Sequence, residues 1–262
     1  MKYYYREHLK DYQRVKEEGK ASRAEIYGSP GFEDFASREF LEKVLPTLQF
    51  SSPHPDVLEY GCGTGPGACF LAQRGFIVDA SDLIPDAIEI AREQAAKRDL
   101  SIHYEVQDIC ELPHEGKQYD MIVDSYCLQG IVTTEDRQNV FSAVKARLKP
   151  DGYYLVSTAT IDESQIESES IIRDSERAAV YLRYQETNLI NMVSHMVFRP
   201  LQEAIDLYED AIEIDGSWYL PVRRHYTPEL VKAEIESAGF DVTPFPVNIP
   251  EQDGEHMVCT LR

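Results

Sequence analysis

Short apolar runs alternate with amphipathic stretches along the middle of the chain. The apolar or alternating runs predict five strands, at residues 57–60, 76–82, 102–106, 119–123 and 153–158. Between them, apolar residues recur at helical spacing, in segments 68–72, 85–98 and 135–148. This strand–helix alternation with short loops predicts an α/β fold with a doubly wound, mainly parallel sheet. Sheets of this kind bind ligands at the carboxyl ends of their strands.

After Thr160 the pattern changes. About 58 mostly polar residues follow without a strand–helix repeat, and segments 171–182 and 201–212 fit amphipathic helices and strands equally well. Segments 211–214 and 218–222 alternate in a way that also fits strands. We therefore expect an inserted cap that selects the substrate.

The core pattern returns at Thr227, a candidate N-cap followed by Pro228, and predicts a helix that Gly239 ends. Two further strands, 240–245 and 257–261, can close the sheet. We expect three parts: a helical N-terminal lid, a core in two pieces and the cap. Their bounds are 1–50, 51–159 with 226–262, and 160–225.

The chain is strongly acidic. Its 262 residues include 26 Lys and Arg against 46 Asp and Glu, a formal net charge of −20. Residues 160–217 contribute −9 of this, with 4 basic and 13 acidic residues. Such a chain repels phosphate backbones and anionic membranes, so nucleic acid and membrane are disfavoured as partners. An acidic cap over a binding site would favour neutral or cationic ligands over anions.

Other classes of protein are disfavoured by what the sequence lacks. Five scattered cysteines form no C-x-x-C pair, and no His, Asp and Glu grouping has metal-ligand spacing, so neither disulfides nor a metal site is predicted. No apolar run marks a signal peptide or approaches the roughly 18 residues of a membrane span. We expect a cytoplasmic protein, either a monomer or a homodimer.

A glycine-dense loop, Gly61-Cys62-Gly63-x-Gly65, follows the first predicted strand. Glycines let backbone N–H groups approach a ligand that side chains would otherwise block. The spacing Gly63-x-Gly65-x-x-Ala68 also fits the relaxed dinucleotide pattern, so a nicotinamide or flavin enzyme is an alternative.

Acidic residues at the ends of three successive strands separate these alternatives. Glu59 lies two residues before the first glycine, where it would repel a pyrophosphate and favour a cationic amino group. Asp82 ends the second strand and can accept hydrogen bonds from both hydroxyls of a ribose. Asp108 follows the third strand and can accept from an adenine amino group, with Leu83 and Ile109 as apolar walls.

The chain resembles the class I S-adenosylmethionine-dependent methyltransferases. The resemblance rests on Glu59-x-Gly61-x-Gly63-x-Gly65, on Asp82, and on segments 107–109, 119–120 and 148–152. The resemblance covers about 56–160 and 226–262. It implies a Rossmann-like sheet of seven strands, the last antiparallel, and S-adenosylmethionine as the cofactor.

The resemblance also implies roles for single residues. Glu59 and the glycine loop would face the methionine moiety, Asp82 the ribose, and Asp108 with Ile109 the adenine. One departure is Pro-Gly at 66–67, where the family more often continues directly into the helix, so the first helical turn is expected to shift.

Groups that bind the methyl acceptor are expected in the segments that flank the cofactor site, because this chemistry needs no universal catalytic residue. Ser125, Tyr126 and Gln129 follow the fourth strand, where we expect contacts to the methionine moiety and the acceptor. Tyr27, in the aromatic-rich N-terminal region, is expected to close over the methionine end.

The end of the cap supplies further candidates. A histidine ordinarily titrates near neutrality, so His195 and His225 are candidate general bases, with Tyr226 beside the second. Arg223 and Arg224 could hold a substrate carboxylate or phosphate, or could instead neutralise nearby acids.

The sequence thus predicts a methyltransferase that acts on O or N of a small-molecule acceptor. Two alternatives stay open: the acceptor is a tRNA base or a protein side chain, or the chain binds S-adenosylmethionine as a sensor without transferring its methyl group.

Overall fold

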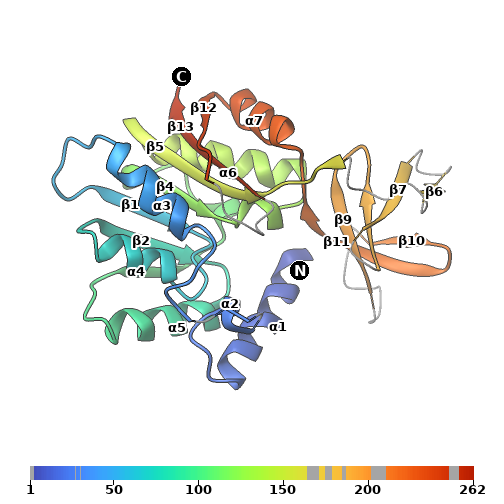
Figure 1. The fold of residues 1–262 in the computed structure, drawn as a ribbon, viewed down its shortest axis with the longest axis horizontal. Helices are drawn as coiled ribbons and strands as arrows, with labels where there is room; N and C mark the ends of the chain where they lie inside the picture. The colour runs from blue at the N-terminus through green and yellow to red at the C-terminus, as the bar shows by residue number, and fades with distance from the viewer. Residues whose placement is uncertain are drawn as a thin grey trace.

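The computed structural model describes residues 3–26, 28–29, 31–163, 171–174, 179–184, 187–201, 211–247 and 254–262. Within these residues the chain forms two β-sheets, a larger one flanked by helices and a smaller one at its side (Figure 1).

The larger sheet has seven strands in the order β12-β13-β5-β4-β1-β2-β3. Their bounds are β1 Asp56–Tyr60, β2 Ile77–Asp82, β3 His103–Val106, β4 Tyr119–Ser125, β5 Leu148–Ala159, β12 Phe240–Pro244 and β13 Gly254–Leu261. β1 to β5 pair in parallel, whereas β13 runs antiparallel to both β5 and β12. The predicted doubly wound sheet of seven strands is confirmed.

Side chains of the central strands alternate between two apolar layers. In β4, Met121 and Val123 belong to one layer and Ile122 to the other. Residues of α3, α4 and α5 contribute to the first layer, and those of α6 and α7 to the second. The helix bounds are α3 Arg38–Val44, α4 Pro66–Ala72, α5 Pro85–Ala96, α6 Thr134–Arg147 and α7 Pro228–Ser237. Because helices cover both faces, the central strands are nearly continuous apolar runs.

Two boundaries differ from those predicted. α4 begins at Pro66 because Gly65 adopts a positive φ of 82° and a proline needs no amide partner at the first helical position. β5 begins at Leu148, where a turn was predicted to continue to residue 152. Leu148 already pairs with Tyr119, and the register then shifts before regular pairing resumes along β4.

The second sheet is antiparallel, with six strands in the order β10-β11-β9-β8-β7-β6. Their bounds are β6 Ile171–Asp174, β7 Ala179–Tyr184, β8 Asn188–Asn191, β9 Met196–Pro200, β10 Ile212–Ile214 and β11 Ser217–Arg224. Strands are therefore the correct alternative for the described parts of 171–182 and for 211–222, while 202–210 lie outside the described residues. The sheet falls within the predicted cap, whose exact bounds stay a prediction.

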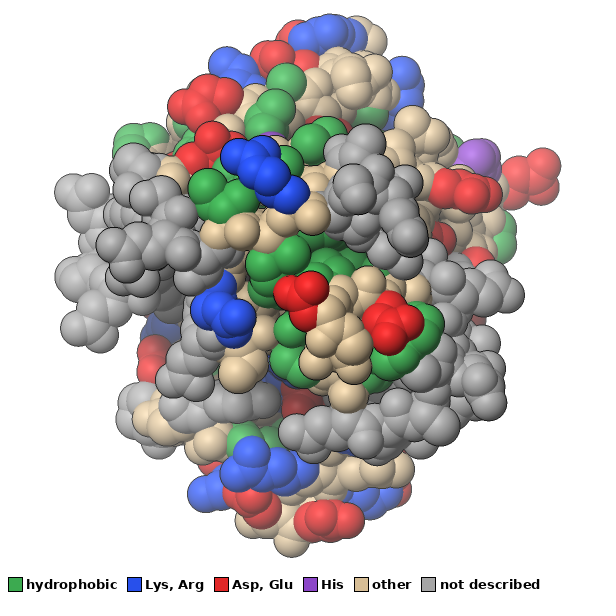
Figure 2. Space-filling model, turned by 90° about the vertical axis from the view of Figure 1, so that its right-hand side faces the viewer, with side chains coloured by type: hydrophobic (Ala, Val, Ile, Leu, Met, Phe, Trp, Pro, Cys, Tyr) green, Lys and Arg blue, Asp and Glu red, His purple; other side chains and the backbone are tan. Residues whose placement is uncertain are grey.

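The second sheet has apolar clusters of its own. Leu182, Ile190 and Val197 pack together in one cluster, and Leu189 and Phe198 in another. Figure 2 looks onto this end of the molecule and shows exposed side chains of both charge signs around a central group of hydrophobic ones.

The N-terminal region begins with α1 (Tyr3–Glu17) and α2 (Arg23–Ile26). Tyr12 and Val15 of α1 pack against Ile84, Ala87 and Ile90, at the start of α5 and just before it. α1 also contacts β11, so it lies between the carboxyl edge of the larger sheet and the second sheet. Among the described residues, no helix is long and apolar enough to cross a membrane.

Candidate functional site

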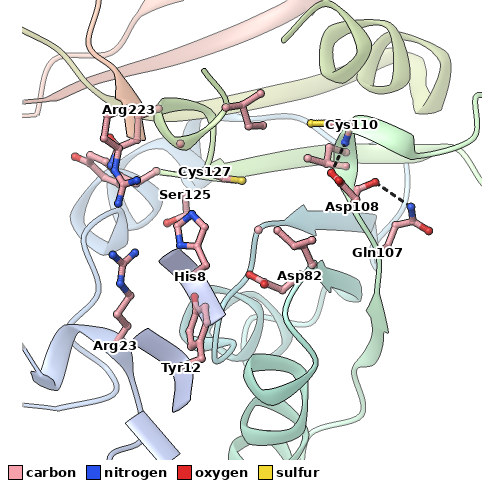
Figure 3. Close-up of a pocket in the computed structure, with 17 residues that line it drawn as sticks. His8, Tyr12, Arg23, Asp82, Gln107, Asp108, Cys110, Ser125, Cys127 and Arg223 are labelled. Carbon is pink, nitrogen blue, oxygen red and sulfur yellow. Dashed lines mark hydrogen bonds between the residues drawn. The ribbon is translucent and has the colours of Figure 1, made fainter. Parts of the chain in front are cut away.

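A cavity lies at the carboxyl edge of the larger sheet, where the sequence predicted a ligand (Figure 3). Residues at the ends of four strands line this cavity: Gly61 after β1, Asp82 at the end of β2, Asp108 after β3 and Ser125 at the end of β4. Side chains from α1, α2 and β11 complete the lining. The cavity therefore combines parts of the chain that are far apart in sequence.

Asp82 is held in place by backbone amides. Its Oδ2 accepts a hydrogen bond from the N–H of Gly63 at 2.9 Å, and its Oδ1 accepts one from Ile84, also at 2.9 Å. Burial raises the pKa of Asp82, and the two amide donors oppose that shift. Each carboxylate oxygen has a further lone pair, so Asp82 can still accept hydrogen bonds from a ligand in the cavity.

Asp108 begins the short 3₁₀ helix Ile109–Glu111. Its Oδ1 accepts from the N–H of Cys110 at 2.9 Å, and its carbonyl oxygen accepts from Nε2 of Gln107 at 2.9 Å. Leu83 and Ile109 line the cavity beside it. The lining thus combines a fixed polar group with two apolar side chains, a set suited to a flat heterocycle with an amino group.

The glycine loop meets tight steric limits. Gly61, Gly63 and Gly65 adopt φ values of 62°, 56° and 82°, which other residues rarely adopt. A Cβ atom at Gly61 would overlap the side chain of Cys127. Gly61 lines the cavity, whereas Cys62, Gly63 and Gly65 are not among its lining residues.

Glu59, which was predicted to face the methionine moiety, is not among the residues that line the described cavity. It is 2% exposed, and its carboxylate contacts Gly67 and accepts a hydrogen bond from the N–H of Ala68, beneath the first turn of α4. Burial raises its pKa to about 8. The carboxylate is therefore turned towards the N-terminus of α4, where the missing side chain of Gly67 leaves space for it.

The loop after β4 contributes three predicted residues to the lining: Ser125, Tyr126 and Gln129. The Ser125 hydroxyl hydrogen-bonds the hydroxyl of Ser37 at 2.5 Å, and Oε1 of Gln129 accepts from the N–H of Ala159 at 2.7 Å. Tyr126 has a positive φ of 62°, and burial raises the pKa of its phenol to about 12. These hydrogen bonds connect the end of β4 to the segment before α3, and the following loop to the end of β5.

The N-terminal helices bring His8, Tyr12 and Arg23 into the cavity. His8 and Arg23 were not predicted. The spacing of four between His8 and Tyr12 puts them on one face of a helix, and this was the available signal. Tyr27, predicted to close over the site, lies outside the described residues.

The three predicted catalytic candidates lie away from the cavity lining. Nε2 of His195 is 2.8 Å from Oε1 of Glu163, and the backbone N–H of His225 donates to the carbonyl oxygen of His195 at 3.0 Å. Tyr226 packs against the second apolar layer. His195, His225 and Tyr226 thus lie where the second sheet joins the core, outside the described lining, and their catalytic role stays a prediction.

The two neighbouring arginines separate. Arg223 lines the cavity, whereas Arg224 is 3% exposed and donates to Thr134 Oγ1 at 3.3 Å and to Tyr226 Oη at 3.2 Å. Successive side chains of a strand point to opposite faces, so one arginine of the pair can reach the cavity. The predicted substrate role can therefore apply to Arg223, and Arg224 belongs to the packing.

Across the described ranges, no group of three or more His, Cys, Asp or Glu side chains is placed to hold a metal ion.

Comparison with known sequences identifies the central part of the chain. Residues 57–152 match the model of a methyltransferase domain. Over 108 residues the chain is 34% identical to a ubiquinone biosynthesis O-methyltransferase of Haemophilus ducreyi, covering 39% of this chain and 44% of that protein. The same kind of protein from Rickettsia typhi is 37% identical over 102 residues, covering 39% and 40%. The chain thus aligns with less than half the length of these curated relatives.

Solved structures share the fold over nearly the whole chain. The CcbJ methyltransferase from Streptomyces caelestis has a TM-score of 0.64 at 14% identity, covering 92% of this chain and 96% of that one. The glycopeptide N-methyltransferase MtfA, solved with S-adenosyl-L-methionine, has a TM-score of 0.59 at 18% identity, covering 87% and 95%. At 14% and 18% sequence identity, the similarity to these two structures concerns the fold alone.

Proposed function

We propose that this chain transfers a methyl group from S-adenosylmethionine to an oxygen or nitrogen of a small-molecule acceptor, because residues 57–152 match the model of a methyltransferase domain. One observation carries the proposal: the described cavity collects Asp82, Asp108 and Gly61 from three neighbouring strand ends. The relatives named as O-methyltransferases and the fold shared with an N-methyltransferase agree with either acceptor atom.

The residues present fit S-adenosylmethionine. Asp82 has acceptor capacity left for the ribose hydroxyls, and Asp108 can accept from the adenine amino group between Leu83 and Ile109. Gly61 and Ser125 also line the cavity, and we assign the methionine end of the cofactor to them. When bound, the cofactor supplies an already activated methyl group on a positively charged sulfur.

The contribution of the protein is then to align the acceptor with the methyl group. His8 is the histidine of the described lining. Burial, together with the charges of Arg223 and Arg23, lowers its pKa to about 3, so the imidazole is neutral at pH 7. A pKa this low makes His8 a weak base, so we assign to it a hydrogen bond that aligns the acceptor, in place of the general-base role predicted for His195 and His225.

Calorimetry of the full chain tests the cofactor. S-adenosylmethionine and its demethylated product, S-adenosylhomocysteine, should compete for one site, and NADH should not bind. Incubation with methyl-labelled cofactor and, separately, a metabolite extract, total tRNA and a protein lysate then identifies the acceptor class. Label confined to tRNA or protein would replace the small-molecule acceptor, and absence of label in all three would favour the sensor.

Some finer statements also belong to this proposal. We expect the protein to act in the cytoplasm, as a monomer or homodimer. We also expect no nucleic-acid partner, because the net charge of −20 opposes phosphate binding. Size-exclusion chromatography with light scattering measures the oligomeric state.

A further inference from the structure

Ser37 directly precedes α3, at the position where a serine normally caps a helix. A capping serine accepts a hydrogen bond, through its side-chain oxygen, from a backbone amide of the first helical turn. The Ser37 hydroxyl makes no such bond, and its backbone, with φ −90° and ψ 5°, departs from the extended conformation usual for this position. The hydroxyl is therefore directed elsewhere.

The hydroxyl of Ser37 reaches the end of β4. Its Oγ lies 2.5 Å from Oγ of Ser125, and Ser125 is one of the residues that line the described cavity (Figure 3). Ser37 itself is fully buried and is not part of the lining. Ser37 can therefore act on a ligand in the cavity only through Ser125.

Burial decides which of the two hydroxyl groups donates. Among the described residues, Ser125 is the hydrogen-bond partner of the Ser37 hydroxyl. If Ser37 accepted this bond, its own proton would stay unpaired in the interior of the protein, which costs free energy. Ser125 is only partly buried, so its proton can reach the cavity. We therefore take Ser37 as the donor, and Ser125 keeps its proton for a ligand.

The surroundings of α3 hold Ser37 in this position. The ring of Phe40, in the first turn of α3, is fully buried and stacks on His256 of β13, with ring centroids 4.7 Å apart. Nδ1 of His256 lies 2.9 Å from Oγ of Ser157, and Ser157 pairs with Ser125 across β5 and β4. The start of α3 and the end of β4 are thus connected through the same strands of the larger sheet.

A hydroxyl that presents its proton to a cavity selects a hydrogen-bond acceptor. The methionine end of the cofactor carries two charged groups: an ammonium group, which only donates, and a carboxylate, which only accepts. The proton of Ser125 therefore matches the carboxylate. Hydrogen bonds to an ionised acceptor are also stronger than those between neutral groups.

We propose that Ser125 donates a hydrogen bond to the carboxylate of the cofactor, and that Ser37 is a positioning residue that holds the Ser125 hydroxyl in the donating orientation. This inference rests on the proposed function and on the assignment of the methionine end to Ser125. It adds to the site a residue that lies outside the matched methyltransferase domain, 57–152.

The test is calorimetry of the full chain with three ligands that differ at the methionine end. S-adenosylhomocysteine has the ammonium group and the carboxylate, its decarboxylated form keeps only the ammonium group, and 5′-methylthioadenosine lacks the amino-acid part. Ser125→Ala should weaken S-adenosylhomocysteine about tenfold and Ser37→Ala about threefold or more, because a hydrogen bond to a charged group is lost or misdirected. Neither variant should change the affinity for the other two ligands by more than about twofold.

Further variants separate positioning from a general effect on folding. In the Ser125→Ala background, Ser37→Ala should not weaken S-adenosylhomocysteine again, because the hydroxyl that Ser37 orients is already absent. Ser157→Ala changes a fully buried serine that is paired with Ser125 but lies outside the cavity lining, and should bind all three ligands like the wild type. Circular dichroism and thermal unfolding show whether each variant folds. If Ser37→Ala does not fold, Ser37→Cys, a weaker donor of similar size, replaces it.

The results can be told apart. If S-adenosylhomocysteine does not bind the wild type, the proposed function itself fails. If it binds, and both serine variants bind it as the wild type does, the inference is overturned and the proposed function stands. Equal losses with S-adenosylhomocysteine and its decarboxylated form would also overturn it, because Ser125 would then not contact the carboxylate. A loss in Ser125→Ala alone, or additive losses in the double variant, would overturn the role of Ser37.

Discussion

Asp82 offers the most direct test of how the cavity binds its cofactor. The change Asp82→Ala removes a carboxylate that is 8% exposed and that accepts from two backbone amides, those of Gly63 and Ile84. It therefore removes both the proposed acceptor for the ribose hydroxyls and the anchor that connects the glycine loop to the end of β2.

The magnitude follows from these contacts. Two hydrogen bonds from ribose hydroxyls to a carboxylate contribute about 1.5 kcal/mol each at the low end, so affinity should fall by about 3 kcal/mol, roughly 100-fold. Stability should fall by less, about 1–2 kcal/mol. The two amides lose their acceptor, but the cost of burying the carboxylate, which raises its pKa, disappears with it.

Calorimetry with S-adenosylhomocysteine measures the affinity, and urea unfolding measures the stability. The same loss should appear with 5′-methylthioadenosine, because both ligands contain the ribose. Asp86→Ala serves as the control: Asp86 lies in the first turn of α5, pairs with Lys16 at 3.1 Å and is not part of the cavity lining. If Asp82→Ala binds both ligands within threefold of the wild type while Asp86→Ala does the same, the assignment of the ribose to Asp82 is refuted.

Three further changes test other parts of the fold. Gly61→Ala should lower stability by more than Gly19→Ala, because both glycines have a φ near +60° but an added Cβ meets other atoms only at Gly61; urea unfolding measures both, and equal losses would contradict the steric argument. The pKa of Glu59 is raised to about 8, so the folded state binds its proton more tightly than the unfolded state does. The free energy of unfolding should therefore fall by up to about 1.4 kcal/mol per pH unit as the pH rises from about 4.5 to 8. Glu59→Gln should reduce this dependence of stability on pH, and an unchanged dependence would show that Glu59 ionises freely. Arg137→Gln should lower the free energy of unfolding by about 3–5 kcal/mol, because Arg137 is 2% exposed and is bound to a carboxylate of α7. Arg14→Gln breaks an exposed ion pair and should lower it by under about 0.5 kcal/mol in the same assay. Similar losses in both variants would contradict the role of burial.

The parts of the fold that depend on local pattern could be predicted from the sequence. Parallel strands covered on both faces are continuous apolar runs, and β1, β2 and β4 were found on that signal. Asp82 and Asp108 were found because a strand end fixes where the next residue lies relative to the sheet edge. Asp82 and Asp108 could therefore be assigned to one cavity without knowing any contact between distant parts of the chain.

The positions of other residues depend on contacts that no local pattern encodes. His8 and Arg23 reach the cavity because α1 packs on α5 and touches β11, more than two hundred residues later in the chain. Glu59 satisfied the motif, but its side chain turned towards α4, where Gly67 leaves space.

For Arg223 and Arg224 a local signal did exist. Extending the predicted strand 218–222 by two residues places the two side chains on opposite faces, and this would have assigned one of them to the cavity.

The two chain segments that connect the second sheet to the core run side by side, since the N–H of Ile161 donates to the carbonyl oxygen of Tyr226 at 3.0 Å. The sheet also packs its own apolar clusters. An insertion whose two ends lie side by side can be exchanged for another one. Such an exchange leaves the strand ends that hold Asp82 and Asp108 intact and replaces Arg223. Recombination of this kind could change the methyl acceptor without changing the residues proposed to bind the adenosine part of the cofactor.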